Sequence, residues 1–301
     1  MTTTTAPAPR RGRPRVPHKG AIAILLVPFG ILFSLFYVLP IVFATVQSLL
    51  VVQRDGTFGK AELVFGGLTQ YALVFQNEAF WASVGRMLLF GVVQVPVMLG
   101  LALLFALLLD SPLVKGKRFF RLAFFVPYAV PGVIAAIMWG SLFSPNLSPF
   151  TALTQNVNFL GADLVLWSIA NVVTWVYVGY NMLIIYSSLL SIPTEIYEAA
   201  RLDGAGHIRI AWSIKIPLVR PAIVMTAIFS IIGTLQLLAE PQVFRSFSSA
   251  VTSTFTPNMT VYATASIPNT NLAAAFSVVL AVTTFVLSFG FMKYMQRKGN
   301  A

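Results

Sequence analysis

The sequence of 301 residues contains no cysteine and little charge, since Asp, Glu, Lys and Arg together make up only 10% of it. The missing cysteine excludes a disulfide framework, a thiol nucleophile and a metal site with thiolate ligands. Only two histidines occur, His18 and His207, and they lie too far apart along the chain to predict a histidine-based metal site. An ordinary soluble domain has roughly 25% charged residues. A soluble globular protein is therefore excluded.

Hydrophobic residues make up 57% of the chain, more than a core of ordinary size can hide from water. They gather in six long stretches, each close to or above the ~20 residues with which a helix crosses a bilayer. We therefore predict an all-α integral membrane protein with six transmembrane helices in one domain, residues 21–293. The six stretches lie at 21–46, 84–109, 122–143, 164–190, 221–239 and 272–292.

Lysine and arginine are unevenly distributed between the segments that join these stretches. Sixteen of the twenty lie in 1–20, 110–121, 191–220 and after 292. Because positive residues accumulate on the cytoplasmic side, both termini and these two loops are predicted to be cytoplasmic. The basic charge then reports the topology of a multi-pass protein of a bacterial-type inner membrane, and we expect no nucleic acid partner.

Both ends of the chain are predicted to be cytoplasmic tails. Residues 1–20 combine five basic residues with four prolines, a composition that is typical of disorder. Residues 294–301 form a second, short tail. A secretory signal is the alternative for the N-terminus, but its apolar part would span only ~7–15 residues. The apolar stretch here continues to Val46, which favours a retained helix.

The spans carry few groups for chemistry. The phosphate-binding pattern G-x-x-x-x-G-K-[ST] is absent, so this chain does not bind ATP by that route. Acidic and basic residues are missing from 122–162, 164–194 and 221–239, which disfavours proton-coupled transport but leaves Na⁺ coupling open. A membrane enzyme is disfavoured as well, because no cluster of acid, base, metal ligand or nucleophile is found in the spans.

Prolines interrupt several of the spans. Pro96 lies in the second stretch, and Pro127 and Pro131 lie in the third. Each proline frees a carbonyl that needs another partner, which is tolerated where helices pack together or where they line a watery cavity. Both interpretations remain open.

The basic loop 191–220 is the most informative segment of the chain. Pro193 suits the start of a helix, and Glu195 favours its positive N-terminal end. Gly204 or Gly206 would end this helix, and a second short helix is predicted from about 206 to 214, ending before Pro217. The loop is thus predicted to fold as helix, glycine turn and helix beneath the membrane.

One face of this loop carries only small side chains, so another backbone can approach it closely. Its small residues are Ala199, Ala200 and Gly204, and charges that would set the register of a partner flank them. The alternative is an interfacial amphipathic helix without a partner. Those charges are carried by Glu198, Arg201, Asp203 and Arg209.

The spacing in this loop resembles the EAA loop of permease subunits in binding-protein-dependent ABC importers. The residues are Glu198-Ala199-Ala200, then Gly204 after three residues, Ile214 after nine more and Ile216-Pro217 after one. Other matches, over nearly the whole chain, resemble the carbohydrate-uptake branch of maltose and glycerol-phosphate type. They are Gly67-Leu68, Tyr71, Phe75 and Phe80-Trp81; Lys115 to Arg121 with Pro127 and Pro131; and Gly179 to Met182 with Ser191 to Pro193.

Two departures leave the substrate subgroup open. Arg86 stands where the family has asparagine, and 245–249 reads Arg-Ser-Phe-Ser-Ser where the family has a Gly-Gly-Pro stretch.

The resemblance implies a type I ABC importer in which this chain is not itself an enzyme. Its partners would be a second permease subunit, two cytoplasmic ATPase subunits and an extracytoplasmic solute-binding protein. ATP and Mg would bind to the ATPase and not to this chain. For Glu198, stabilisation of the helix dipole is the alternative to a coupling role. The residues implied in coupling to the ATPase are Glu198, Ala199, Ala200, Asp203 and Gly204.

The expected solute is an uncharged sugar or oligosaccharide, because hydroxyl, amide and aromatic groups in the spans suit a polyol better than an ion. A phosphate-bearing solute remains open. The alternative function is a secondary carrier that moves a neutral polar solute without ATP. The residues predicted to line the pathway are Trp175, Tyr180, Asn181, Ser230, Thr234, Gln236 and Glu240.

Overall fold

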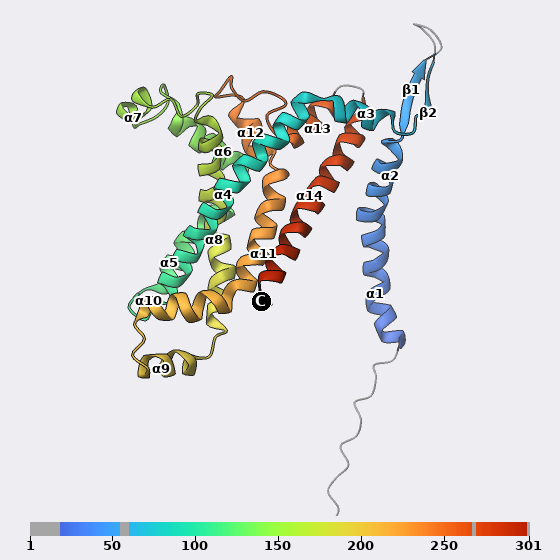
Figure 1. Cartoon of the computed structure of the whole chain (residues 1–301). Coiled ribbons are helices and arrows are strands. Elements are labelled where there is room, and N and C mark those ends of the chain that lie inside the picture. The colour runs from blue at the N-terminus through green and yellow to red at the C-terminus, as the bar shows by residue number, and fades with distance from the viewer. Residues whose placement is uncertain (1–18, 55–59, 267–268, 300–301) are drawn as a thin grey trace, which may run out of the picture. The chain divides into compact units, whose positions relative to one another are not determined.

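Figure 1 shows the computed structural model, which describes residues 19–54, 60–266 and 269–299 and consists mainly of helices. The chain divides into two compact units, residues 1–46 and 47–301. Within the described residues, five helices are long and apolar enough to cross a membrane, and a bent pair of helices makes a sixth if it counts as one span. The predicted helical fold class is therefore confirmed, with five or six of the predicted spans.

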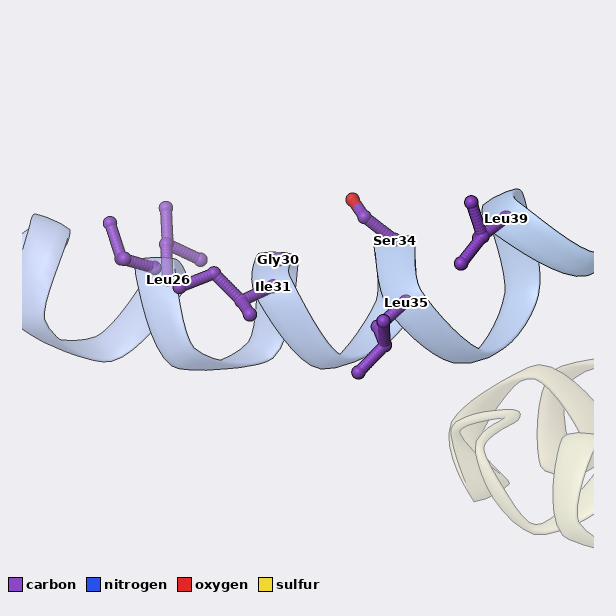
Figure 2. A pocket seen from close by; sticks show the side chains of 7 residues that line it. Leu26, Gly30, Ile31, Ser34, Leu35 and Leu39 are labelled. Carbon is purple, nitrogen blue, oxygen red and sulfur yellow. The ribbon is translucent and has the colours of Figure 1, made fainter.

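The described part of the first unit is one long helix. Of the tail predicted for residues 1–20, residues 1–18 lie outside the described residues, and Lys19 and Gly20 belong to the helix instead. The apolar side chains of the helix are exposed, for example Phe36 at 66%. Figure 2 shows a shallow hollow over Gly30, lined by side chains of the neighbouring turns. Such a surface suits hydrocarbon, in agreement with the first predicted span. The helix consists of α1 (Lys19–Phe33), a π-helical segment (Ser34–Val38) and α2 (Leu39–Gln47), whose last residue belongs to the second unit.

The second unit holds all the other described elements. Its first helix, α3, follows a two-stranded antiparallel hairpin in which Leu50 pairs with Phe65 and Arg54 with Ala61. The elements in chain order are β1 (Leu50–Arg54), β2 (Ala61–Phe65), α3 (Thr69–Gln76), α4 (Glu78–Asp110), α5 (Lys117–Phe125), α6 (Gly132–Phe143), α7 (Thr151–Asn156), α8 (Val165–Leu190), α9 (Thr194–Leu202), α10 (His207–Ile210), α11 (Ile216–Leu235), α12 (Ala239–Phe244), α13 (Pro257–Ser266) and α14 (Thr270–Gly299).

The third apolar stretch, 122–143, is not one continuous helix. One 3₁₀ turn, Val126–Ala129, follows α5, and the chain then bends by 95° before α6 begins at Gly132. Pro131 has no N–H with which to continue the preceding helix, and its fixed φ suits the start of a new one. Pro127 and Pro131, for which packing kinks and a watery cavity both remained open, thus lie where this span is broken.

The sequence predicts that the helix after Gly206 ends before Pro217. In the structure it does not end there. It continues from α10 through a π-helical segment, Ala211–Lys215, into α11. In this segment the Ile216 N–H donates to the Ala211 carbonyl, five residues back. The wider π turn relieves the clash that a proline ring otherwise makes with the carbonyl four residues earlier. The π segment in the first unit lies in the same position before Pro40.

Close packing between α4, α5 and α8 forms the centre of the second unit. A Cβ atom on Gly179 would overlap the Phe124 carbonyl, so only glycine allows α8 this approach. Ala102 and Ala106 of α4 are completely buried where they pack near Met182. Lipid gives no hydrophobic force between helices, so small residues that permit close contact stabilise such a bundle. At the other end of the chain, α14 extends to Gly299 and includes most of the range predicted to be a tail, 294–301.

Candidate coupling site

Helix α9 lies with α10 at the lower end of the second unit (Figure 1). Pro193 is its N-cap residue, Glu195 lies in its first turn and Arg201 in its last turn. This arrangement of charge complements the helix dipole, which favours acidic groups at the N-terminus and basic groups at the C-terminus. The helix therefore forms where the sequence predicts it, and for the predicted reason.

The turn after α9 depends on Gly204. Its φ is +80°, in the left-handed region that glycine adopts without a steric penalty. The Gly204 N–H donates to the Arg201 carbonyl at 3.0 Å, and the Ala205 N–H donates to the Ala200 carbonyl at 2.9 Å. These two bonds form a Schellman motif, which satisfies carbonyls at the end of a helix. The backbone is thereby reversed in one fixed way towards α10.

The residues predicted to couple to the ATPase form an accessible surface. Glu198, Ala199, Asp203 and Gly204 are exposed, and Ala200 is half-buried. A Cβ atom on Gly204 would meet nothing within 4 Å. Space therefore remains above the turn for a partner's backbone. Their role in coupling remains a prediction.

Three large apolar side chains near this turn were missed by sequence reasoning. Leu202 is 90% exposed, Ile208 78% and Trp212 70%. Scattered apolar residues are normal on a surface, but several beside one turn indicate an interaction site. The available signal was their occurrence in a loop otherwise rich in charge. We call residues 194–215 the coupling segment.

Between the coupling segment and the end of α4 lies a cavity of about 260 Å³. Asp110 at the end of α4 pairs there with Lys215, whose ammonium lies 5.0 Å from the centre of the Tyr197 ring. Burial raises the pKa of the Tyr197 phenol, and the negative charge of Asp110 raises it further. The lining residues are Leu107, Asp110, Ser111, Pro112, Thr194, Tyr197, Arg201, His207, Ile210, Ala211 and Lys215.

Three of the predicted pathway residues lie on α8, and each contacts a different neighbour. Tyr180 stacks on Tyr128 with ring centres 4.6 Å apart. Trp175 meets Trp139 edge to face at 6.0 Å. Asn181 is buried, and its amide donates to the Tyr177 carbonyl at 3.1 Å.

The other four pathway residues lie on or after α11 and face different surroundings. Thr234 is buried against Gly91 of α4, while Ser230 is half-buried and Gln236 exposed. Glu240 is buried beside Gly132 at the N-terminal end of α6, where the helix dipole favours a negative charge.

The seven predicted pathway residues do not form one constellation. Among the described residues, no side-chain hydrogen bond, ion pair or ring contact joins two of them, although the Gln236 backbone N–H donates to the Thr234 carbonyl at the end of α11. Their role in the pathway remains a prediction.

A family model matches the sequence over residues 98–299, which include the coupling segment. Its description is "Binding-protein-dependent transport system inner membrane component". The match covers more than half of the chain.

Characterised relatives extend the likeness over almost the full length. The lactose transport system permease protein LacF of Rhizobium radiobacter is 30% identical over 278 residues, covering 88% of this chain and 91% of that protein. The sn-glycerol-3-phosphate transport system permease protein UgpA of Agrobacterium fabrum is 30% identical over 210 residues, covering 68% and 70%.

Solved structures share the fold at low sequence identity. The chain matches a bacterial ABC transporter involved in the import of the acidic polysaccharide alginate with a TM-score of 0.74 at 17% identity, covering 92% of this chain and 96% of that one. It also matches a bacterial alginate ABC transporter in complex with an alginate pentasaccharide-bound periplasmic protein, with a TM-score of 0.76 at 18% identity and coverages of 93% and 94%.

Proposed function

The chain belongs to the family of binding-protein-dependent transport system inner membrane components, and we propose that it forms part of the pathway by which an ABC importer takes up a sugar or oligosaccharide. It is a permease subunit of an ABC transporter, and its secondary-carrier alternative is disfavoured by this membership. A relative named for the transport of lactose supports a sugar as the solute. A neutral sugar is favoured because the third to fifth apolar stretches contain no acidic or basic residue.

The membrane topology that fits this function has six crossings and both termini in the cytoplasm. Five long helices and the bent pair α5–α6 supply the crossings, with the bent pair as one of them. The distribution of lysine and arginine supports the orientation. In this topology the coupling segment faces the cytoplasm, where ATP is available, and 21–293 is the membrane domain.

The proposed assembly contains this chain, a second permease subunit, two cytoplasmic ATPase subunits and an extracytoplasmic solute-binding protein. One solved neighbour is a transporter in complex with a solute-bound periplasmic protein. ATP and Mg would be held by the ATPase subunits, since the sequence of this chain lacks a phosphate-binding loop. Hydrolysis would then take place outside this chain.

The exposed glycine turn carries the proposed mechanism. Helix α9 and the turn at Gly204 present Glu198, Ala199 and Asp203 on an accessible surface. We place this surface against a cleft of the ATPase, with Leu202 and Trp212 as apolar contacts. When ATP closes the ATPase pair, the coupling segments of the two permeases move together and the pathway opens outward. The free energy comes from the different affinities of the two conformations for ATP and for loaded binding protein.

The test is purification through a tag on this chain in mild detergent, followed by reconstitution with the proteins that accompany it. We expect a second permease and an ATPase in near-equal amounts. Proteoliposomes should then take up a radiolabelled disaccharide only with binding protein and ATP present. Recovery of the chain alone after gentle cross-linking in cells, with uptake independent of ATP, would favour the secondary carrier.

A further inference from the structure

An ion pair joins the end of α4 to the last residue of the coupling segment. Asp110 is the last residue of α4, and Lys215 is the last residue of the π segment before α11. The two residues are 105 positions apart, and their side chains are only 12% and 13% exposed. Both side chains are therefore largely buried. A buried charge is unfavourable without a partner, and here each charge has the other.

The position of Asp110 is unfavourable without such a partner. An acidic group in the last turn of a helix lies at the negative end of the helix dipole. Two cations compensate for this: Lys215 pairs with the carboxylate, and Lys117 of α5 donates to the Asp110 backbone carbonyl at 3.3 Å. Only Lys215 binds the carboxylate itself in the described structure, so the two lysines form a natural pair for comparison.

The coupling helix is tied to the same pair through Tyr197. The Lys215 ammonium lies 5.0 Å from the centre of the Tyr197 ring, within the range of a cation–π contact. Tyr197 belongs to α9, so α4, α9 and the helix leading into α11 meet at one ammonium group. Side chains of all three elements line the cavity of about 260 Å³ at this point.

The π segment sets the direction of Lys215. It holds one more residue per turn than an α-helix, and one residue turns the face of a helix by about 100°. The bond from the Ile216 N–H to the Ala211 carbonyl shows this wider turn directly before Pro217. The same feature that accommodates the proline thus fixes where Lys215 lies relative to α11.

We propose that Asp110 and Lys215 are positioning residues that tie the coupling helix α9 to the membrane helices α4 and α11. A movement imposed on α9 by the ATPase then reaches both membrane helices together. Without the tie, α9 moves while α4 and α11 lag, so ATP is hydrolysed with less solute transported. This inference rests on the proposed function, because it needs a partner ATPase that moves α9.

The test uses the full complex in proteoliposomes and measures ATP hydrolysis and solute uptake in the same samples. The variants are Asp110→Asn and Lys215→Met, and the matched control is Lys117→Met, which removes a cation that does not bind the carboxylate. We expect the ATP hydrolysed per solute to rise roughly 5- to 10-fold in the first two variants, within the usual range of a coupling effect. The control should stay close to the unmodified complex.

Two further variants separate positioning from folding. Asp110→Asn combined with Lys215→Met leaves no unpaired charge, so it should assemble normally yet remain uncoupled. Lys215→Arg keeps both the ion pair with Asp110 and a cation beside the Tyr197 ring, so it should retain much of the coupling.

Three results have distinct meanings. An unchanged ratio of ATP to solute in the neutral double variant would overturn the positioning role. A Lys215→Arg variant that assembles but is as uncoupled as Lys215→Met would overturn the cation at position 215 as its cause. If the unmodified complex takes up no solute with ATP, the proposed function fails instead.

Discussion

Two glycines in different regions of this protein are needed for opposite reasons. Gly179 lies in the membrane bundle, where a Cβ atom would overlap the Phe124 carbonyl of the neighbouring element. Gly204 lies in the coupling segment, where a Cβ atom would meet nothing within 4 Å but the φ of +80° disfavours other residues. In the bundle, glycine is needed because the helices pack too closely for any side chain. In the coupling turn, glycine is needed because its positive φ reverses the backbone, and the surface around it stays open.

This difference separates stability from function along one chain. Substitution at the packed glycine should lower the amount of folded protein in the membrane, because two helices can no longer pack closely. Substitution at the exposed glycine should leave the protein in the membrane and remove its activity. The two regions can therefore be distinguished by measuring abundance and transport side by side.

The largest effect is expected for Gly179→Ala. Although alanine favours a helix by about 0.5–1 kcal/mol over glycine, the overlap with the Phe124 backbone forces α8 away. We expect a loss of about 3 kcal/mol, at the upper end of the cost of overpacking. Membrane abundance and thermal stability in detergent measure it.

The matched control is Gly100→Ala in α4, where the added methyl group meets nothing within 4 Å. That variant should be as abundant as the unmodified protein. Equal abundance of both variants would mean that close approach at Gly179 does not limit folding.

Gly204→Asp should abolish transport while the protein still inserts. The new carboxylate adds bulk and charge to the surface on which we place the ATPase. Gly204→Asn is the control, since asparagine has nearly the same size, carries no charge and tolerates the left-handed region. We expect the asparagine variant to retain part of the transport, measured as uptake at equal membrane levels. Normal uptake by the aspartate variant would rule out the coupling role of this turn.

A smaller effect is expected for Trp212→Ala. This side chain is 70% exposed, so its removal should hardly change stability. If it anchors the ATPase, binding should weaken by about 2 kcal/mol, or roughly thirtyfold, as for other aromatic residues central to an interface. Titration of the ATPase against the purified permease pair measures this.

The control for that experiment is Phe285→Ala on α14, which is 66% exposed but lies in a membrane span. It should bind the ATPase with unchanged affinity. An equal loss in both variants would show that exposed aromatic residues stabilise the permease in general and do not mark its cytoplasmic contact.

The coupling turn could be predicted from the sequence because its causes are local. Pro193, Glu195 and Gly204 each act within a few residues, through a fixed φ, a helix dipole and a positive φ. The bent third span and the continuous helix through Pro217 could not be predicted in the same way. A proline kinks, breaks or is accommodated by a π turn according to its tertiary neighbours, and those lie elsewhere in the chain.

The contacts of the candidate sites show the same limit. Asp110 and Lys215 are 105 positions apart, and no local pattern relates them. The pathway residues were chosen for their chemistry, but the chemistry of Thr234 and Gln236 does not tell which is buried. Thr234 is 6% exposed and packs on α4, whereas Gln236 is exposed. Which face a polar group occupies is decided by helix packing.

The smallest effect is expected for Tyr197→Phe, a substitution that lies where the coupling segment meets the bundle. Among the described residues the Tyr197 hydroxyl has no hydrogen-bond partner, whereas its ring contacts Lys215. Because a buried hydroxyl without a partner is unfavourable, removing it should raise stability by about 1 kcal/mol at neutral pH. Tyr197→Leu loses the ring and should cost about 0.5–1 kcal/mol.

Alkaline pH should further favour the Tyr197→Phe variant over the unmodified protein. The pKa of Tyr197 is raised in the folded state, first by burial and then by the charge of Asp110. Because the pKa is higher in the folded than in the unfolded protein, the protonated phenol contributes fully to the free energy of unfolding below the pKa of the unfolded state, about 10. This contribution is lost as pH rises through the pKa of the folded state. Phenylalanine does not titrate, so the variant should lose less stability above pH ~10. Thermal unfolding of both proteins across this range measures the difference, and parallel curves would place the Tyr197 hydroxyl in water.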